Sequence, residues 1–439
     1  MRASSRGQRG RIPASRTCMP SALLFAALLG LASCDRACAD ESSPADQPAW
    51  PRGIKPALVY DSAAFANLGG GVRSGGTYTS NLNLQLNFDA TTLFGWPDTI
   101  AYVDALWLQG GLPSSFVGDA QGVSNISAPN AVKIYEAWVQ KNFLSNHISL
   151  LVGLYDLNSE FYALNSAGLF LNSSFGMGPE FSQSGVEGPS VFPDTSVGMR
   201  FAFKPAEGVI VRTAVLDGVP VDRPNGGRGI FEAGDGVLLV GELALIDRPE
   251  FRTAPMSGRF RLGRQAMLGD YDQKFAIGGW YYSASFNDLS ETQANGQPVR
   301  HHGAGGFYVL TDQLLYRDPD LSARKLTGFV QVGVGDNQVD RFGAYLGVGL
   351  TAVGLFEGRP ADEIGLGLAY GQDGSHYLAA QRMQGLPVTN AEKAIELTYL
   401  IPVTAWLALQ PDLQYVITPN TTPAIPNALA FQLRLEMSF

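Results

Sequence analysis

Regular alternation of apolar and polar residues constrains this chain more than any other feature of its sequence. In NLNLQLNFD, residues 81–89, every second residue is apolar, and the residues between are amides and one acid. Successive side chains of a strand point to opposite faces, so this stretch predicts a strand with one apolar and one polar face. The polar face would meet bulk water in a soluble sandwich and a lumen in a membrane barrel. The stretch alone leaves both interpretations open.

Residues 1–39 indicate export. The apolar run ALLFAALLGLA at 22–32 follows an arginine-rich start, is too short to span a bilayer, and has the length of a signal h-region. LASC at 31–34 resembles a lipobox that would lipidate Cys34, whereas ACA at 37–39 is the pattern that ordinary signal peptidase prefers. We favour cleavage after Ala39, which predicts a signal peptide over 1–39 and an N-terminal periplasmic tail over 40–56.

Cleavage at this position changes what the mature chain can do. It removes Cys18, Cys34 and Cys38, which are all the cysteines, so no disulfide or cysteine metal site is expected. It also removes six arginines and one aspartate, so 25 Lys and Arg remain against 39 Asp and Glu, and the net formal charge falls from −9 to −14. This balance disfavours a nucleic-acid partner, because no basic patch exists to neutralise phosphates.

The alternation returns along the whole chain, whereas helical periodicity with capping residues is hard to find. AFQLRLEMSF at 430–439 and SVGMRFAFK at 196–204 are two further examples. The sequence therefore predicts an all-β protein. The strands are expected near 58–68, 80–89, 100–108, 132–140, 148–156, 197–204, 208–216, 238–246, 274–286, 306–313, 326–335, 342–350, 363–370, 394–400, 406–416 and 428–439.

The spacing between these strands favours a closed membrane barrel. Outer-membrane barrels alternate short periplasmic turns with longer outer loops. Counting from either end gives this alternation only if the further candidate 258–266 is not a barrel strand, which leaves about sixteen strands in a closed antiparallel barrel over 57–439. Long outer loops are then expected at 109–131, 157–196, 217–237, 287–305, 371–393 and 417–427. An even, closed count leaves no edge unpaired, as lipid requires.

Several stretches resemble the OprB family of carbohydrate-selective porins. They are GLYDLNSEFY at 153–162, NSSFGMGPEFSQ at 172–183 with FPDTSVGMRF after it, ELTYLIPVTAWLALQPDLQYVITPN at 396–420, ALAFQLRLEMSF at 428–439 and, more weakly, GGWYYSASFND at 278–288. The terminal Phe439 also resembles the general outer-membrane assembly signal. The resemblance implies a sixteen-stranded outer-membrane barrel that admits glucose and other small carbohydrates by facilitated diffusion, with no cofactor.

The loop at 157–196 is expected to fold inward and narrow the lumen, because it is the longest and combines polar side chains with phenylalanines. Sugars offer hydroxyl groups and apolar C–H faces, so polar groups beside aromatic rings suit their passage. Within the loop, Asn158, Glu160 and Phe161 are the candidates for solute contact. Strand alternation adds these inward-facing candidates: Asp104, Arg200, Arg212, Trp280, Arg434 and Glu436. Trp280 faces inward only if Phe275 and Ile277 face lipid.

Other interpretations remain at this stage. In one alternative, the charged candidates do not contact solute but form internal ion pairs that stabilise the barrel wall. Glu160 would then anchor the loop. A barrel of this kind could also be a general porin without sugar selectivity or an outer-membrane hydrolase. A secreted β-sandwich lectin, which is not a barrel, is the third alternative. No GxSxG or zinc motif is present, and His301 and His302 are adjacent on a predicted outer loop, so an enzyme is disfavoured. Outer-membrane lipid, the assembly machinery and further copies of the chain are expected partners.

Overall fold

The computed structural model describes residues 50–220, 230–247, 271–321 and 323–439. The predicted signal peptide at 1–39, the tail up to residue 49 and the strand candidate 258–266 lie outside them. The tail is predicted to end at residue 56, but β1 already begins at Ile54, so residues 54–56 belong to the barrel.

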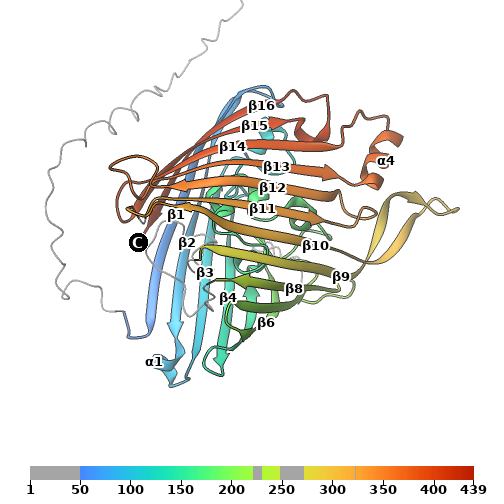
Figure 1. Cartoon of the computed structure of the whole chain (residues 1–439). Helices are drawn as coiled ribbons and strands as arrows, with labels where there is room; N and C mark the ends of the chain where they lie inside the picture. Colours follow the sequence, from blue (N-terminus) through green and yellow to red (C-terminus); the bar gives the residue numbers. More distant parts are fainter. Residues whose placement is uncertain (1–49, 221–229, 248–270, 322) are drawn as a thin grey trace, which may run out of the picture. The chain divides into compact units, whose positions relative to one another are not determined.

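Sixteen antiparallel strands form one closed barrel in which β1 pairs with β16, which confirms the predicted fold class (Figure 1). Every predicted strand overlaps an observed one. The strands are β1 (Ile54–Gly69), β2 (Gly75–Asp89), β3 (Thr99–Gly110), β4 (Ala131–Phe143), β5 (Ile148–Tyr155), β6 (Ser196–Ala206), β7 (Val209–Asp217), β8 (Val237–Ile246), β9 (Gln273–Thr292), β10 (Pro298–Arg317), β11 (Lys325–Val334), β12 (Phe342–Val353), β13 (Glu363–Asp373), β14 (Ala391–Pro402), β15 (Leu407–Ile417) and β16 (Ala428–Ser438).

The helical elements are short. No helix among the described residues is long and apolar enough to cross a membrane. The helices are α1 (Ala90–Phe94), α2 (Ser114–Val117), η1 (Leu157–Ser159), η2 (Ala167–Leu169), η3 (Ser173–Phe175), α3 (Pro179–Ser182), α4 (Ser375–Met383) and η5 (Pro419–Thr421).

The two faces of β2 answer the question that its alternation raises. Leu84 is 48% exposed on the outside of the barrel, whereas the amides Asn81 and Asn87 on the inner face are buried. The same pattern continues around the barrel, so the outer surface is an apolar belt. Exposed members of this belt include Val139, Val152, Phe201, Leu243, Ile277, Leu350, Leu366, Leu397, Leu413 and Leu433. A soluble sandwich would place such side chains inside, so the lectin interpretation is excluded.

The region between β8 and β9 bears out the parity argument. The two strands pair directly, with Leu238 opposite Tyr282 and Ile246 opposite Lys274. No further strand therefore stands between them in the barrel wall.

The predicted outer loop 287–305 is wrong in its extent. β9 and β10 continue to pair outward as far as Thr292 and Pro298, so only residues 293–297 form the turn. In this turn Gly296 N donates to Gln293 O at 2.9 Å, and Gly296 has φ +79°, a conformation that glycine adopts without a steric penalty. His301 and His302 thus lie in β10 rather than in a loop.

Candidate functional site

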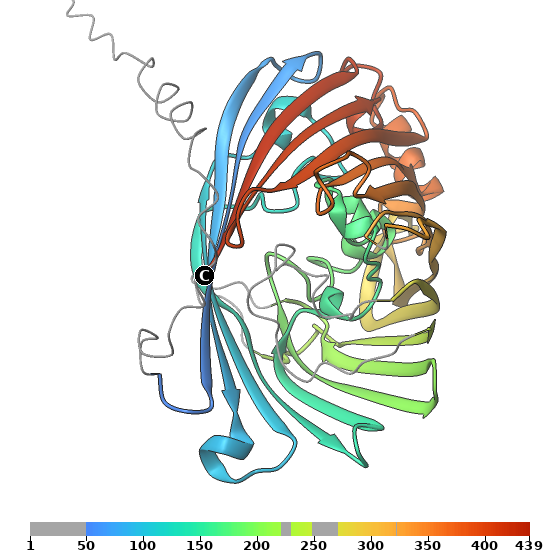
Figure 2. The ribbon, with the colours of Figure 1, turned by 60° about the vertical axis from the view of Figure 1, so that its left-hand side comes forward.

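The segment between β5 and β6, residues 156–195, folds into the barrel, and we call it L3. It corresponds to the predicted constriction loop 157–196, and Figure 2 shows it in green inside the ring of strands. Four of its five phenylalanines are buried: the ring of Phe181 stacks on Trp280 of β9 with 4.2 Å between ring centroids, and the ring of Phe170 lies 5.5 Å from that of Phe329 in β11. L3 is therefore a packed layer on one side of the lumen.

Glycines on the inner faces of β11 and β13 make room for this layer. A Cβ atom on Gly333 would lie 1.9 Å from Oε1 of Glu180, and one on Gly365 would lie 2.8 Å from the ring of Phe170. These glycines therefore lie under L3, where any larger residue would push the loop into the lumen.

The first turn of L3 is tied to the wall by a buried ion pair. Arg200 Nε donates to Glu160 Oε2 at 2.7 Å, and the hydroxyl of Tyr155 donates to the same oxygen at 2.6 Å. Arg200 also donates to Gln140 at 2.8 Å and is 1% exposed. This geometry matches the anchoring interpretation of Glu160 and the bracing interpretation of Arg200.

A second buried cluster surrounds Glu242 of β8. Arg212 and Lys274 both approach its Oε1 at 3.5 Å. Its Oε2 accepts from the backbone N–H of Tyr162 at 3.0 Å and from the hydroxyl of Tyr308 at 2.9 Å. The carboxylate thus joins L3 to the wall while two cations balance its charge.

Two further wall carboxylates accept backbone N–H groups of L3. Asp312 of β10 accepts from Ser166 N at 3.1 Å. Glu396 of β14 accepts from Leu171 N at 2.5 Å and from Asn172 N at 3.0 Å, one with each oxygen. L3 thus reaches from β5 and β6 along the inner wall as far as β14.

The segment between β3 and β4, residues 111–130, also enters the lumen, and we call it L2. Its backbone pairs with that of L3, because Asn125 N donates to Leu171 O and Ser173 N donates to Gly122 O, both at 2.8 Å. Glu392 of β14 accepts from Ala120 N at 2.8 Å and from Gln121 N at 2.9 Å. The constriction is therefore built from L2 and L3 together.

The inner faces of β16, β1, β2 and β3 carry a polar row that remains partly exposed, and we call it the open wall. Its partly exposed members are Asp61, Asn83, Gln85 and Glu436. Asp61 is paired in register with Glu436 on one side and with Asn81 on the other. Buried Asp104 orders the row, because Asn83 donates to it at 3.0 Å and Gln85 at 3.2 Å.

The predicted site residues fall into three groups. Asn158, Glu160, Phe161 and Arg200 lie together at the base of L3, where Asn158 Nδ2 donates to Phe161 O at 3.1 Å. Arg212 and Trp280 lie in the wall under L3. Asp104, Arg434 and Glu436 belong to the open wall or its border, since Arg434 donates to Asn125 of L2 at 2.9 Å.

The expected phenylalanine surface for solute contact does not form. Phe161 has 0% exposure, and Phe170 and Phe175 have 1% each, because their rings pack against the wall and one another. Hydrophobic burial holds these rings inside L3 rather than on its lumen side.

The sequence interpretation missed the anchoring carboxylates and L2. A signal for the former existed: alternation places Glu242 and Glu396 on the inner face of otherwise apolar strands. For L2 there was no such signal, because its contacts with L3 follow no periodic pattern.

Burial also sets the acid–base properties of L3. Burial raises the pKa of Glu180 in α3 to about 7, against the opposing effect of a hydrogen bond from Tyr162, whose hydroxyl donates to the carboxyl group at 2.7 Å. In the segment between β11 and β12, burial raises the pKa of Asp340 to about 7 as well. Among the residues that the structure describes, no three metal-ligating side chains are placed to hold an ion.

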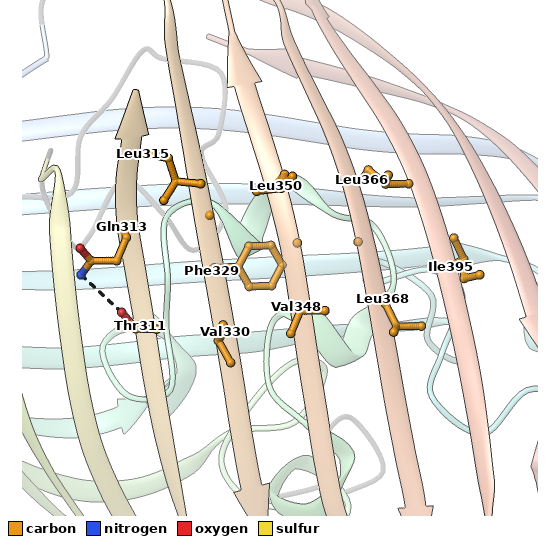
Figure 3. Close-up of a pocket in the computed structure, with 13 residues that line it drawn as sticks. Thr311, Gln313, Leu315, Phe329, Val330, Val348, Leu350, Leu366, Leu368 and Ile395 are labelled. Carbon is orange, nitrogen blue, oxygen red and sulfur yellow. Dashed lines mark hydrogen bonds between the residues drawn. The ribbon is translucent and has the colours of Figure 1, made fainter. Parts of the chain in front are cut away.

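A separate hollow of about 590 Å³ lies on the lipid-facing side of β10–β14 (Figure 3). It opens over Gly328, which provides no side chain between Leu315 and Leu350. Apart from Thr311 and Gln313 its lining is apolar, and it includes the exposed side chains of Leu366 and Ile395. The hollow belongs to the outer apolar belt and not to the lumen.

Comparison with known proteins agrees with this architecture. Residues 73–439 match the family described as carbohydrate-selective porin, OprB family. Porin B of Pseudomonas aeruginosa is 24% identical over 418 residues, which cover 87% of each chain. A putative porin QuiX of Acinetobacter baylyi is 22% identical over 431 residues, which cover 88% of this chain and 90% of the relative.

A solved structure of Pseudomonas putida OprB at high pH shares the fold. It superposes with a TM-score of 0.75 at 20% identity and covers 88% of this chain and 94% of its own. The family match confirms the resemblance seen in the sequence and replaces the hydrolase interpretation, because porins are channels rather than enzymes. The chain belongs to the OprB family of carbohydrate-selective porins and is a sugar porin of the outer membrane.

Proposed function

We propose that sugars cross the barrel along the open wall, between β16–β3 and the layer formed by L2 and L3. The observation that carries this proposal is the difference in exposure between the two sides of the lumen. Asp61, Asn83, Gln85 and Glu436 are partly exposed, whereas inward polar side chains under the loops, such as Glu396 and Gln414, are completely buried.

The chemistry of the open wall suits a neutral, hydroxyl-rich solute. Carboxylate and amide oxygens accept hydrogen bonds from sugar hydroxyls, and amide N–H groups donate to them. Several such groups in a row offer weak successive contacts, which transit requires because a tightly held solute does not leave. Asp104 and Arg434 support the row from behind by orienting Asn83, Gln85 and L2.

The other candidates act in this proposal through L3 and not by touching the solute. Glu160 and Arg200 fix the base of the loop, and Arg212 and Trp280 support its middle. Outer-membrane lipid, the assembly machinery and association into homo-oligomers stay predicted partners. Glucose and other small carbohydrates are the proposed solutes.

Substitutions on the open wall test the proposal. In planar bilayers, Asn83→Ala and Glu436→Gln should each raise the glucose concentration that half-blocks the ionic conductance by about threefold, since Asn83→Ala removes a polar contact and Glu436→Gln replaces a carboxylate contact with a weaker neutral one. Glu357→Gln in the exposed β12–β13 turn serves as the control. Unchanged block in both open-wall variants would contradict this route.

A further inference from the structure

The acidic side chains on the inner wall suggest a role beyond lining the lumen. Glu242, Asp312, Glu392 and Glu396 come from three different strands, β8, β10 and β14, and are 0–3% exposed. Each accepts at least one backbone N–H from L2 or L3. Buried backbone N–H groups need partners, and these loop segments lack a strand partner at those positions.

Glu396 holds L3 with both of its oxygens, as Glu392 holds L2, and its contacts are the ones that continue toward the open wall. Oε1 accepts from Leu171 N and Oε2 accepts from Asn172 N, so two successive peptide units are fixed by one side chain. Each of the two backbone N–H groups thus has an acceptor oxygen of its own. Two nearby contacts complete the attachment: Asn172 Nδ2 donates to Gln414 Oε1 at 3.1 Å, and Gln410 Nε2 donates to Leu169 O at 2.7 Å.

The attachment continues from L3 to the route proposed for the solute. Leu171, which Glu396 holds through its N–H, accepts from Asn125 N of L2 through its carbonyl. Asn125 in turn accepts from Arg434 NH1 at 2.9 Å, beside the open wall. The peptide unit between Leu171 and Asn172, whose N–H also binds Glu396, therefore links Glu396 to the edge of L2 that borders the open wall.

We propose that Glu396 is a positioning residue for sugar passage: by fixing the Leu171–Asn172 backbone it sets the distance between the L2–L3 layer and the open wall. The role requires a carboxylate with two acceptor oxygens. A glutamine has one acceptor oxygen and turns an NH₂ group toward the second backbone N–H, so one of the two donors would lose its partner. The expected effect on glucose block rests on the proposed function, in which the open wall is the solute route. The expected effect on conductance does not.

The test compares Glu396→Gln, Glu396→Asp and Glu357→Gln as purified proteins in planar bilayers, with heat-modifiable gel migration as the check for a closed barrel. Glu396→Gln should raise single-channel conductance and increase the glucose concentration for half-block by about threefold or more, as expected when a buried backbone N–H loses its acceptor. Glu396→Asp, which keeps both oxygens on a shorter side chain, should give a smaller change in the same direction. Glu357→Gln should match the original protein.

The outcomes separate this inference from the proposed route. If Glu396→Gln does not assemble, Glu396→Asp carries the test with the same two measurements. Conductance and glucose block equal to those of the original protein in an assembled Glu396 variant would overturn the positioning role. A changed conductance in Glu396→Gln together with unchanged glucose block in Asn83→Ala and Glu436→Gln would support the positioning role and refute the open-wall route.

Discussion

Gly333 and Glu180 show how single residues shape the lumen of this barrel. Glu180 of α3 enters the space above Gly333 of β11, where even one methyl group would lie 1.9 Å from its Oε1 atom. The hydroxyl of Tyr162 donates to that same oxygen. The absence of a side chain at one wall position thus allows a loop carboxyl group to pack against the strand.

We expect Gly333→Ala to displace α3 toward the lumen, because the added methyl group overlaps Glu180 and overpacking of this kind costs about 1–3 kcal/mol. Single-channel recordings should then show altered conductance and larger current fluctuations. Gly241→Ala on β8 is the matched control, because nothing lies within 4 Å of its Cβ position. Equal recordings from the two variants would contradict the packing of L3 described above.

Arg200 illustrates what sequence predicts at this scale and what it does not. Alternation in β6 correctly predicts that Arg200 faces inward, because neighbouring Met199 and Phe201 face lipid. Its burial depends on Glu160 arriving from L3, beside Tyr155 at the end of β5, and L3 has no periodic pattern from which its path could be derived. Facing inward and touching solute are therefore different properties, and only the first follows from strand alternation.

At the scale of elements, L3 carries an acid whose protonation affects its packing. The pKa of Glu180 lies at about 7 in the folded protein and at 4.5 in its unperturbed state. Between these values the folded state binds the proton and the unfolded state does not, so stability falls as pH rises through this window. The carboxyl group is neutral and its packing is most stable at the acidic end.

We therefore expect L3 to fluctuate more at about pH 9 than at about pH 5, and Glu180→Gln to reduce this difference because glutamine stays neutral. Open-channel current noise measures the fluctuation. Asp340, whose pKa is also raised, accepts a hydrogen bond from Gly185 N of L3. Asp340→Asn should therefore remove part of the pH dependence of the noise that remains in Glu180→Gln. An identical pH dependence in Glu180→Gln and the original protein would count against this account.

The long β9–β10 hairpin is joined to α4 through one carboxylate. Asp288 Oδ2 accepts from His301 Nε2 and Oδ1 accepts from His376 Nδ1, both at 2.9 Å. Its Oδ1 also accepts from the backbone N–H groups of Ser290 and Glu291. His376 lies in α4, so one of these contacts connects two outer segments that are distant in sequence.

We expect His376→Ala to speed amide hydrogen exchange in α4 several-fold, since the helix loses its hydrogen bond to the hairpin. His147→Ala is the control, because His147 lies in the exposed β4–β5 turn. Exchange in residues 375–383 that stays as slow as in the control would show that Asp288 does not hold α4.

At the scale of the whole molecule, two kinds of information determine the structure. Alternation locates every strand, because each strand must present apolar residues to lipid and polar or small ones to the inside. Strand ends are less predictable: pairing of β9 with β10 extends past Phe286, where the alternation gives way to charged and polar residues. The loops follow neither rule, so contacts such as that of Asn125 with Leu171 appear only in the structure.

The same distinction explains the functional prediction. The family motifs correctly indicate a sugar porin, since residues 73–439 match the carbohydrate-selective porin family. They do not identify the solute route, because several of the charged residues predicted to line it form ion pairs and hydrogen bonds that fix L3 to the wall. Glu160 and Arg200 are partners of each other.

The central claim is that this barrel, narrowed by L2 and L3, passes sugars along a wetted polar wall. Its most direct test is the ionic conductance of the purified protein in a planar bilayer while glucose or a malto-oligosaccharide is added in steps. The account predicts steady channels whose current falls in a concentration-dependent way as sugar enters. Current that stays constant with every sugar tested would contradict it.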